Sequence, residues 1–242
     1  MKPKSNILCI FEGEKREGQY FNTLKSIYFS DSSILVCSYG NDIYELYREL
    51  KDDQDLDLVE LLRESNSVPK NNQILSNYER DDFNQVFLFF DIECQDEKFN
   101  TNDFLSLIDI FNEETENGKV FISYPMIEAI RDIPSYEGYL THKVQVENCT
   151  GKKYKYLSTQ GIQTFNDPRK NNKADWNQLV KINIEKGNYI MSGDTGNYST
   201  LPEQKRIAEK QTISIAKEKS VFVLSAYPFF IYHQKSSQFS FQ

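Results

Sequence analysis

Two short apolar segments of the chain each end abruptly in acidic residues. The segment Ile7–Phe11 is β-branched and aromatic enough to be a buried strand, and it stops at Glu12. The segment Val86–Phe90 is of the same kind, and it stops at Asp91 and Glu93, with one isoleucine between them. In an open parallel sheet, ligands bind beyond the carboxyl ends of the strands. If the two segments are neighbouring strands, the three acids surround one point.

Such a cluster of acids is typical of a cation site. Carboxylates brought together without cations repel one another, and hard divalent cations such as Mg²⁺ prefer oxygen ligands. The alternation of side chains along a strand predicts that Asp91 and Glu93 point to the same side, with Glu12 opposite them. The alternative interpretation is that all three are ordinary polar residues at strand ends.

These residues also carry a resemblance to known families. A strand that ends in Glu-Gly, a helix, and a later strand that ends in acid-x-acid resemble the TOPRIM domain of topoisomerases, primases and OLD-type nucleases. The longer segment Glu12–Phe21, EGEKREGQYF, resembles the opening motif of the RloB-like abortive-infection proteins, roughly EGExTExxYF. The resemblance covers about the first half of the chain. Arg16 stands where that family usually has Thr, and Glu93 replaces the second Asp of Asp-x-Asp.

The resemblance implies specific roles for the acids. In a TOPRIM site, Mg²⁺ or Mn²⁺ held by Glu12, Asp91 and Glu93 would neutralise phosphodiester charge and position water, with Glu12 as general acid or base. Glu128 lies in a Pro-x-x-Glu sequence just after an expected strand, as in RloB-like proteins, and would supply a second metal position. The alternative for Glu128 is an acid favoured by the dipole at a helix N-terminus.

At the level of function, the resemblance implies a Mg²⁺-dependent endonuclease effector of a bacterial anti-phage defence system. Its substrate would be DNA or RNA, with tRNA among the candidates. It would work under a partner ATPase of the ABC or AAA type, and the chain itself has no P-loop sequence. The alternative is a catalytically silent TOPRIM-like sensor or scaffold that docks on the ATPase. Glu93 and the acidic net charge favour that alternative.

Basic residues could form a track for a nucleic-acid backbone. Residues 152–156 interleave lysines with tyrosines, a composition that can follow phosphates and stack on bases. The net charge of −8 argues against a generally basic coat protein but leaves room for a local track. Each basic group taken alone is more typical of a solvated face. The candidate contacts are Lys15, Arg16, Lys152, Lys153, Lys155, Arg169 and Lys170.

Composition predicts a folded protein away from membranes. The 242 residues are 39% hydrophobic and 14% aromatic, enough to bury a core. No apolar run approaches the length of a transmembrane helix, and the first one is too short for a signal sequence. The four cysteines are scattered and are expected to be buried free thiols, which suits the cytoplasm. Self-association into a homo-oligomer is left open.

The expected fold is α/β and TOPRIM-like, with a mostly parallel sheet flanked by helices and a helical insertion or cap in the C-terminal half. Strands at 6–11, 33–39, 85–90 and 119–124 alternate with helices at 18–29, 43–50, 57–64 and 101–116, which predicts right-handed crossovers. Residues 65–72 are expected to be an exposed loop. The predicted division is a core at 1–135, a cap at 136–201, and a C-terminal part at 202–242 that packs back on the core.

Within the second half, helices are expected at 174–185 and 202–219. A last strand is expected at 220–226, closed by Pro228.

Overall fold

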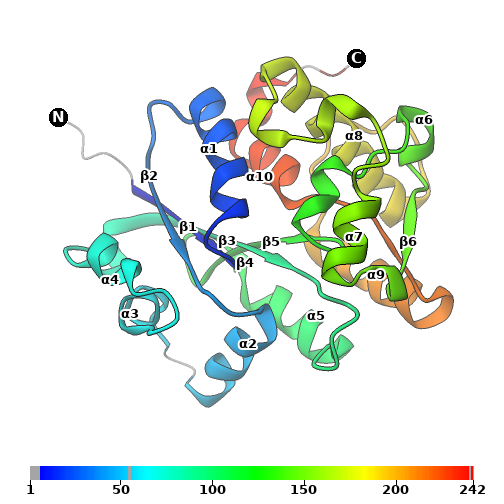
Figure 1. Cartoon of the computed structure of the whole chain (residues 1–242). Helices are drawn as coiled ribbons and strands as arrows, with labels where there is room; N and C mark the ends of the chain where they lie inside the picture. The colour runs from blue at the N-terminus through cyan, green and yellow to red at the C-terminus, as the bar shows by residue number, and fades with distance from the viewer. Residues whose placement is uncertain (1–5, 54–55, 240, 242) are drawn as a thin grey trace.

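A five-stranded sheet forms the centre of the part of the chain that the structure describes, residues 6–53, 56–239 and 241 of a computed structural model (Figure 1). The strand order is β2-β1-β3-β5-β4. All neighbours are parallel except β4, which runs antiparallel to β5. The strands are β1 (Asn6–Phe11), β2 (Ser33–Ser38), β3 (Phe83–Asp91), β4 (Asn112–Glu113) and β5 (Gly118–Ser123). The expected α/β class and mostly parallel sheet are confirmed.

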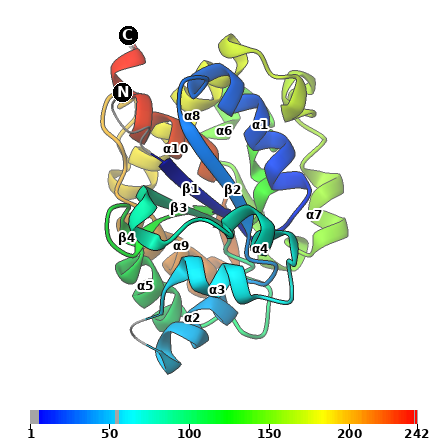
Figure 2. The same ribbon diagram turned by 90° about the vertical axis from the view of Figure 1, so that its left-hand side faces the viewer.

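Helices cover both faces of this sheet, so the middle parts of its central strands are continuous apolar runs. One face is covered by α1 (Arg16–Tyr28) and α10 (Ala226–Lys235), and the other by α2 (Ile43–Asp52) and α5 (Thr101–Ile110) (Figures 1 and 2). Alternation along β3 sends Phe87 and Phe89 toward Phe230 of α10, with ring centroids 5.0 and 5.2 Å from it. Phe90 lies against Tyr39 instead, at 6.1 Å.

The second half of the chain is mainly helical. The long helix α8 packs against α10 and α9, and α9 also packs against α5. Two short strands, β6 and β7, pair antiparallel in a separate small sheet. The elements are α6 (Tyr136–Tyr139), β6 (Lys143–Gln145), α7 (Gly151–Leu157), α8 (Lys173–Ser192), α9 (Gln204–Glu218) and β7 (Ser220–Phe222).

Short helical elements fill the connections in the first half and around the sheet. They are α3 (Leu58–Glu64), α4 (Lys70–Leu75) and the 3₁₀ turns η1 (Arg80–Asp82) and η2 (Ile127–Arg131). No helix among the described residues combines the length and the apolar character that crossing a membrane requires.

The expected last strand is wrong in extent and in partner. Only Ser220–Phe222 is extended, and it pairs with β6 rather than joining the main sheet. Leu224 touches the main sheet through a single bridge to Tyr124. Pro228 does not close a strand. It lies in the first turn of α10, where a proline removes no helical hydrogen bond.

Two further local expectations are wrong because tertiary contacts override them. The helix that begins at Thr101 ends at Ile110 instead of 116, since the next residues form the hairpin strand β4 beside β5. Residues 65–72 are not an exposed loop throughout. Val68 is fully buried, and the buried Asn71 amide donates to the Ser38 carbonyl at 2.7 Å.

Candidate metal centre

The carboxyl ends of β1 and β3 bring Glu12 and Asp91 together. The two strands are parallel neighbours in register, and the Glu12 amide donates to the Phe89 carbonyl at 3.1 Å. One carboxylate oxygen of Glu12 in turn accepts from the Asp91 amide at 3.0 Å. The side chain of Glu12 is thereby fixed across the tip of β3.

An open pocket of about 510 Å³ lies at this edge of the sheet. Its walls come from the tips of β1 and β3, the start of α1, the turn η2 and helix α7. Six acids line it, and we call it the carboxylate pocket: Glu12, Glu14, Glu17, Asp91, Glu93 and Glu128.

Burial and mutual repulsion raise the pKa values of the two central acids. Burial raises the pKa of Glu12 to about 8, against the hydrogen bond from the Asp91 amide, and the charges of Glu93 and Glu17 act with burial. The pKa of Asp91 is raised well above its usual range by burial and then by the Glu12 charge, although the amide of Ile127 donates to its carboxylate. The pair therefore retains a proton near neutral pH unless a cation compensates it.

Glu93 is not placed as strand alternation predicts. β3 ends at Asp91, and Glu93 has a left-handed backbone with φ of 43°. Its carbonyl accepts from the Asp96 amide in a turn. The side chain still lines the carboxylate pocket, and its pKa is raised by burial and by Asp42 and Asp96, and lowered by Lys98 and Lys155.

Glu128 reaches the carboxylate pocket from η2 and is almost fully buried, with 1% of its side chain exposed. One oxygen forms an ion pair with Arg16 of α1. The other oxygen is buried, and no donor from the described residues reaches it. A buried carboxylate oxygen without a partner is costly unless a bound group satisfies it.

Glu17 was not singled out by the sequence reasoning. It lies in the first turn of α1, with its carboxylate over Gly13: a Cβ at Gly13 would lie 2.9 Å from a Glu17 oxygen. Its charge raises the pKa of both Glu12 and Asp91. The available signal is its position in the segment Glu12–Phe21, in the first turn of the helix that follows β1.

The predicted basic track is only partly assembled. Lys15, Arg16 and Lys155 line the carboxylate pocket, and Arg16 and Arg169 line a neighbouring one. The structure places the other three outside both pockets, Lys152 and Lys153 exposed on α7 and Lys170 exposed beside Asp167.

The donor set fits Mg²⁺ in chemistry, although it is not a preformed cage. Within the described ranges, no group of three or more His, Cys, Asp or Glu side chains is arranged to hold a metal ion. Mg²⁺ is commonly held by one or two carboxylates together with waters and substrate phosphates. Glu12 and Asp91 supply two such carboxylates, and the partnerless oxygen of Glu128 lies in the same pocket.

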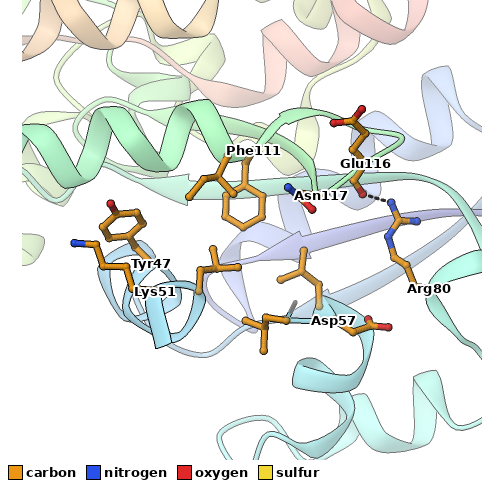
Figure 3. Close-up of a pocket in the computed structure, with 11 residues that line it drawn as sticks. Tyr47, Lys51, Asp57, Arg80, Phe111, Glu116 and Asn117 are labelled. Carbon is orange, nitrogen blue, oxygen red and sulfur yellow. Dashed lines mark hydrogen bonds between the residues drawn. The ribbon is translucent and has the colours of Figure 1, made fainter. Parts of the chain in front are cut away.

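A larger cavity of about 580 Å³ lies elsewhere, between α2, α3 and the end of α5 (Figure 3). Tyr47 and Phe111 are among its lining residues. Of its two cations, Lys51 pairs with Asp103, and Arg80 donates to the backbone carbonyls of Phe83 and Glu116. Its described lining has two cations and two acids, Asp57 and Glu116, rather than a cluster of one sign, so the carboxylate pocket is the stronger candidate for chemistry.

No protein-family model, curated protein or solved structure matches the chain. The candidate site is therefore judged on its own geometry and charge.

Proposed function

We propose that the chain is a Mg²⁺-dependent nuclease that hydrolyses phosphodiester bonds at the carboxylate pocket. The observation that carries the proposal is the half-buried pair Glu12 and Asp91 at two parallel strand tips. The Asp91 amide donates to the Glu12 carboxylate, and burial and like charges raise the pKa values of both acids. Perturbed acids in a pocket are typical of functional sites. Cations at the pocket wall, Lys15 and Lys155, suit an anionic substrate.

In this proposal, Glu12 and Asp91 would hold the metal, with Glu128 as a further oxygen ligand. The bound ion would neutralise phosphodiester charge and lower the pKa of a water. Lys15 and Lys155 orient the phosphate at the rim. Because the clustered acids disfavour a full set of negative charges, one carboxyl of the cluster can carry a proton and pass it to the leaving oxygen.

The biological setting comes from the resemblance of Glu12–Phe21 to the RloB-like abortive-infection proteins. We propose an effector of an anti-phage system that is controlled by an ATPase of the ABC or AAA type. DNA and RNA, including tRNA, remain alternatives for the substrate.

A second candidate function is a silent TOPRIM-like module that docks on the ATPase. The ion pair between Arg16 and Glu128 favours it, since it occupies one oxygen of a prospective ligand. The lack of a three-ligand group among the described residues points the same way.

Cleavage of plasmid DNA, single-stranded DNA and total tRNA, with Mg²⁺, Mn²⁺ or EDTA, tests the proposal. Each reaction is run with and without the partner ATPase. The variants are Glu12→Gln, Asp91→Asn and, as a matched control, Glu137→Gln, an exposed acid on α6 that does not line the carboxylate pocket. We expect metal-dependent cleavage that is lost at least 100-fold in the first two variants and kept in the control. Cleavage that all variants share, or none under any condition, would contradict the nuclease proposal.

A further inference from the structure

A second, smaller pocket of about 280 Å³ adjoins the carboxylate pocket, and Arg16 lines both. It lies between the first half of α1, the turn η2 and residues 166–169 of the segment that precedes α8. This segment packs beside α1 (Figure 2). That segment is fastened to α1, since the Thr23 hydroxyl donates to the Arg169 carbonyl at 3.3 Å. We call this smaller pocket the arginine pocket, and its lining includes Arg16, Tyr20, Arg131, Asn166, Asp167 and Arg169.

The arginine pocket carries an excess of positive charge. Among the described residues that line it are three guanidinium groups and a single carboxylate, that of Asp167, which holds Arg169 through two hydrogen bonds of 2.6 and 2.9 Å. Arg16 pairs with Glu128, which does not line this pocket. Among the described residues, no carboxylate lies within ion-pair distance of Arg131. Arg131 is held in place by neutral acceptors, the Ser158 hydroxyl at 3.0 Å and the Lys155 carbonyl at 2.9 Å.

All three guanidinium groups lie close enough to Tyr20 to act on its hydroxyl. Burial raises the pKa of Tyr20, and the charges of Arg131, Arg16 and Arg169 each oppose that shift. The three guanidinium groups and Tyr20 line the same pocket, and the Arg16 and Arg169 side chains are 42% and 56% exposed, so a ligand can reach them from solvent. Guanidinium groups around one point suit the oxygens of a phosphate.

Asn166 adds a requirement that a simple anion does not meet. Its amide nitrogen donates to the Thr159 carbonyl at 3.2 Å and to the Gln163 side chain at 2.9 Å, which fixes the orientation of the amide. Its oxygen is buried and receives no hydrogen bond from the described residues. A donor is needed there, such as a sugar hydroxyl or a base amino group.

We propose that the arginine pocket binds one nucleotide unit of the substrate strand, with its phosphate on Arg131 and Arg169 and its sugar or base beside Asn166. This rests on the proposed function, because it gives the strand a path from the carboxylate pocket across Arg16. It also fixes the strand next to the cleaved bond, so the subsite acts in positioning the substrate.

The chain offers a closely matched pair of variants for the test. Arg169→Gln and Lys170→Gln remove the same charge from adjacent exposed residues, and both take a partner from Asp167. Arg169 lines the arginine pocket and Lys170 does not. A third variant, Asp167→Asn, should have the opposite effect on binding, since it removes the carboxylate that competes with the ligand for Arg169.

The measurement is fluorescence anisotropy with an eight-nucleotide labelled RNA, the same DNA sequence, and inorganic phosphate as competitor, all in EDTA so that no cleavage occurs. We expect Arg169→Gln to weaken binding about tenfold, as loss of a charged hydrogen bond does. Lys170→Gln should change it less than twofold, and Asp167→Asn should tighten it severalfold. The oligonucleotide should bind at least tenfold more tightly than phosphate.

Failure of this inference is distinguishable from failure of the proposed function. Equal effects of Arg169→Gln and Lys170→Gln, no oligonucleotide binding, or phosphate binding as tight as the oligonucleotide would overturn the nucleotide subsite, even if the protein cleaves nucleic acid. A selective effect of Arg169→Gln with no cleavage in any reaction would keep the subsite and reject the nuclease.

Discussion

Replacing Glu12 by Gln should stabilise the metal-free protein at alkaline pH while abolishing its response to Mg²⁺. Gln has the same shape and can accept the hydrogen bond from the Asp91 amide that Glu12 accepts at 3.0 Å. It removes one charge from a half-buried pair of like charges. The substitution therefore isolates the electrostatic cost of the pair from its packing.

The sign and the size of the effect follow from the pKa of Glu12, which is raised from 4.5 to about 8. Between these two pH values the folded protein holds a proton that the unfolded chain has released, so stability falls as pH rises through this window. At about 1.4 kcal/mol per pKa unit, the upper bound is on the order of 5 kcal/mol. The pocket is open to water and the acids share the proton, so we expect about 1–3 kcal/mol.

The assay is urea unfolding in EDTA at pH 5 and pH 8. Wild-type protein should lose about 1–3 kcal/mol more than Glu12→Gln between these pH values, with the exposed control Glu137→Gln behaving like wild type. Added Mg²⁺ should raise the stability of the wild-type protein at pH 8 by mass action and leave that of Glu12→Gln unchanged. A Glu12→Gln protein that is no more stable than wild type at pH 8 would refute the view that Glu12 and Asp91 are mutually repelling, half-buried acids.

Two further predictions concern the elements that position the pocket. Phe230→Ala removes a fully buried ring that contacts the rings of Phe87 and Phe89, so we expect a loss of about 3–5 kcal/mol in urea unfolding. As a control, Tyr156→Ala at an exposed ring should stay within about 0.5 kcal/mol of wild type. Equal losses of stability in Phe230→Ala and Tyr156→Ala would contradict the packing of Phe230 against the sheet. Arg16→Gln leaves the buried Glu128 without its cation and should cost about 1–3 kcal/mol, most of which a second change, Glu128→Gln, should recover in a double-mutant cycle.

The central strands could be predicted because their burial leaves a direct mark on the sequence. β1 and β3 are buried on both faces, so they are continuous apolar runs, and the acids that follow mark where the sheet ends. The start of α2 could be predicted equally well from its N-cap residue. Asp42 accepts hydrogen bonds from the Tyr44 and Glu45 amides, the pattern of an N-cap residue.

What could not be predicted depends on contacts between distant segments. Residues 220–226 are apolar and β-branched, but nothing in that pattern specifies a partner strand, and the structure pairs only the first three with β6. Glu93 leaves strand alternation because the chain turns just after Asp91, where it takes a left-handed backbone. The sequence pattern names Arg16 and Arg169 as candidate nucleic-acid contacts but not Arg131, and it does not predict that these three separate segments meet in one pocket.

The carboxylate pocket is hard to explain as a structural feature alone. Two acids with raised pKa values oppose folding at neutral pH, and an amide in place of either would keep the hydrogen bonds at lower cost. The rings of Phe87, Phe89 and Phe121 pack against Phe230 of α10, with centroids 5.0, 5.2 and 6.0 Å from it, and this packing stabilises the strands next to the acids. A site role predicts that Glu12→Gln gains stability and loses metal response together, whereas a purely structural role predicts a loss of stability. The opposite signs make one unfolding experiment decisive between them.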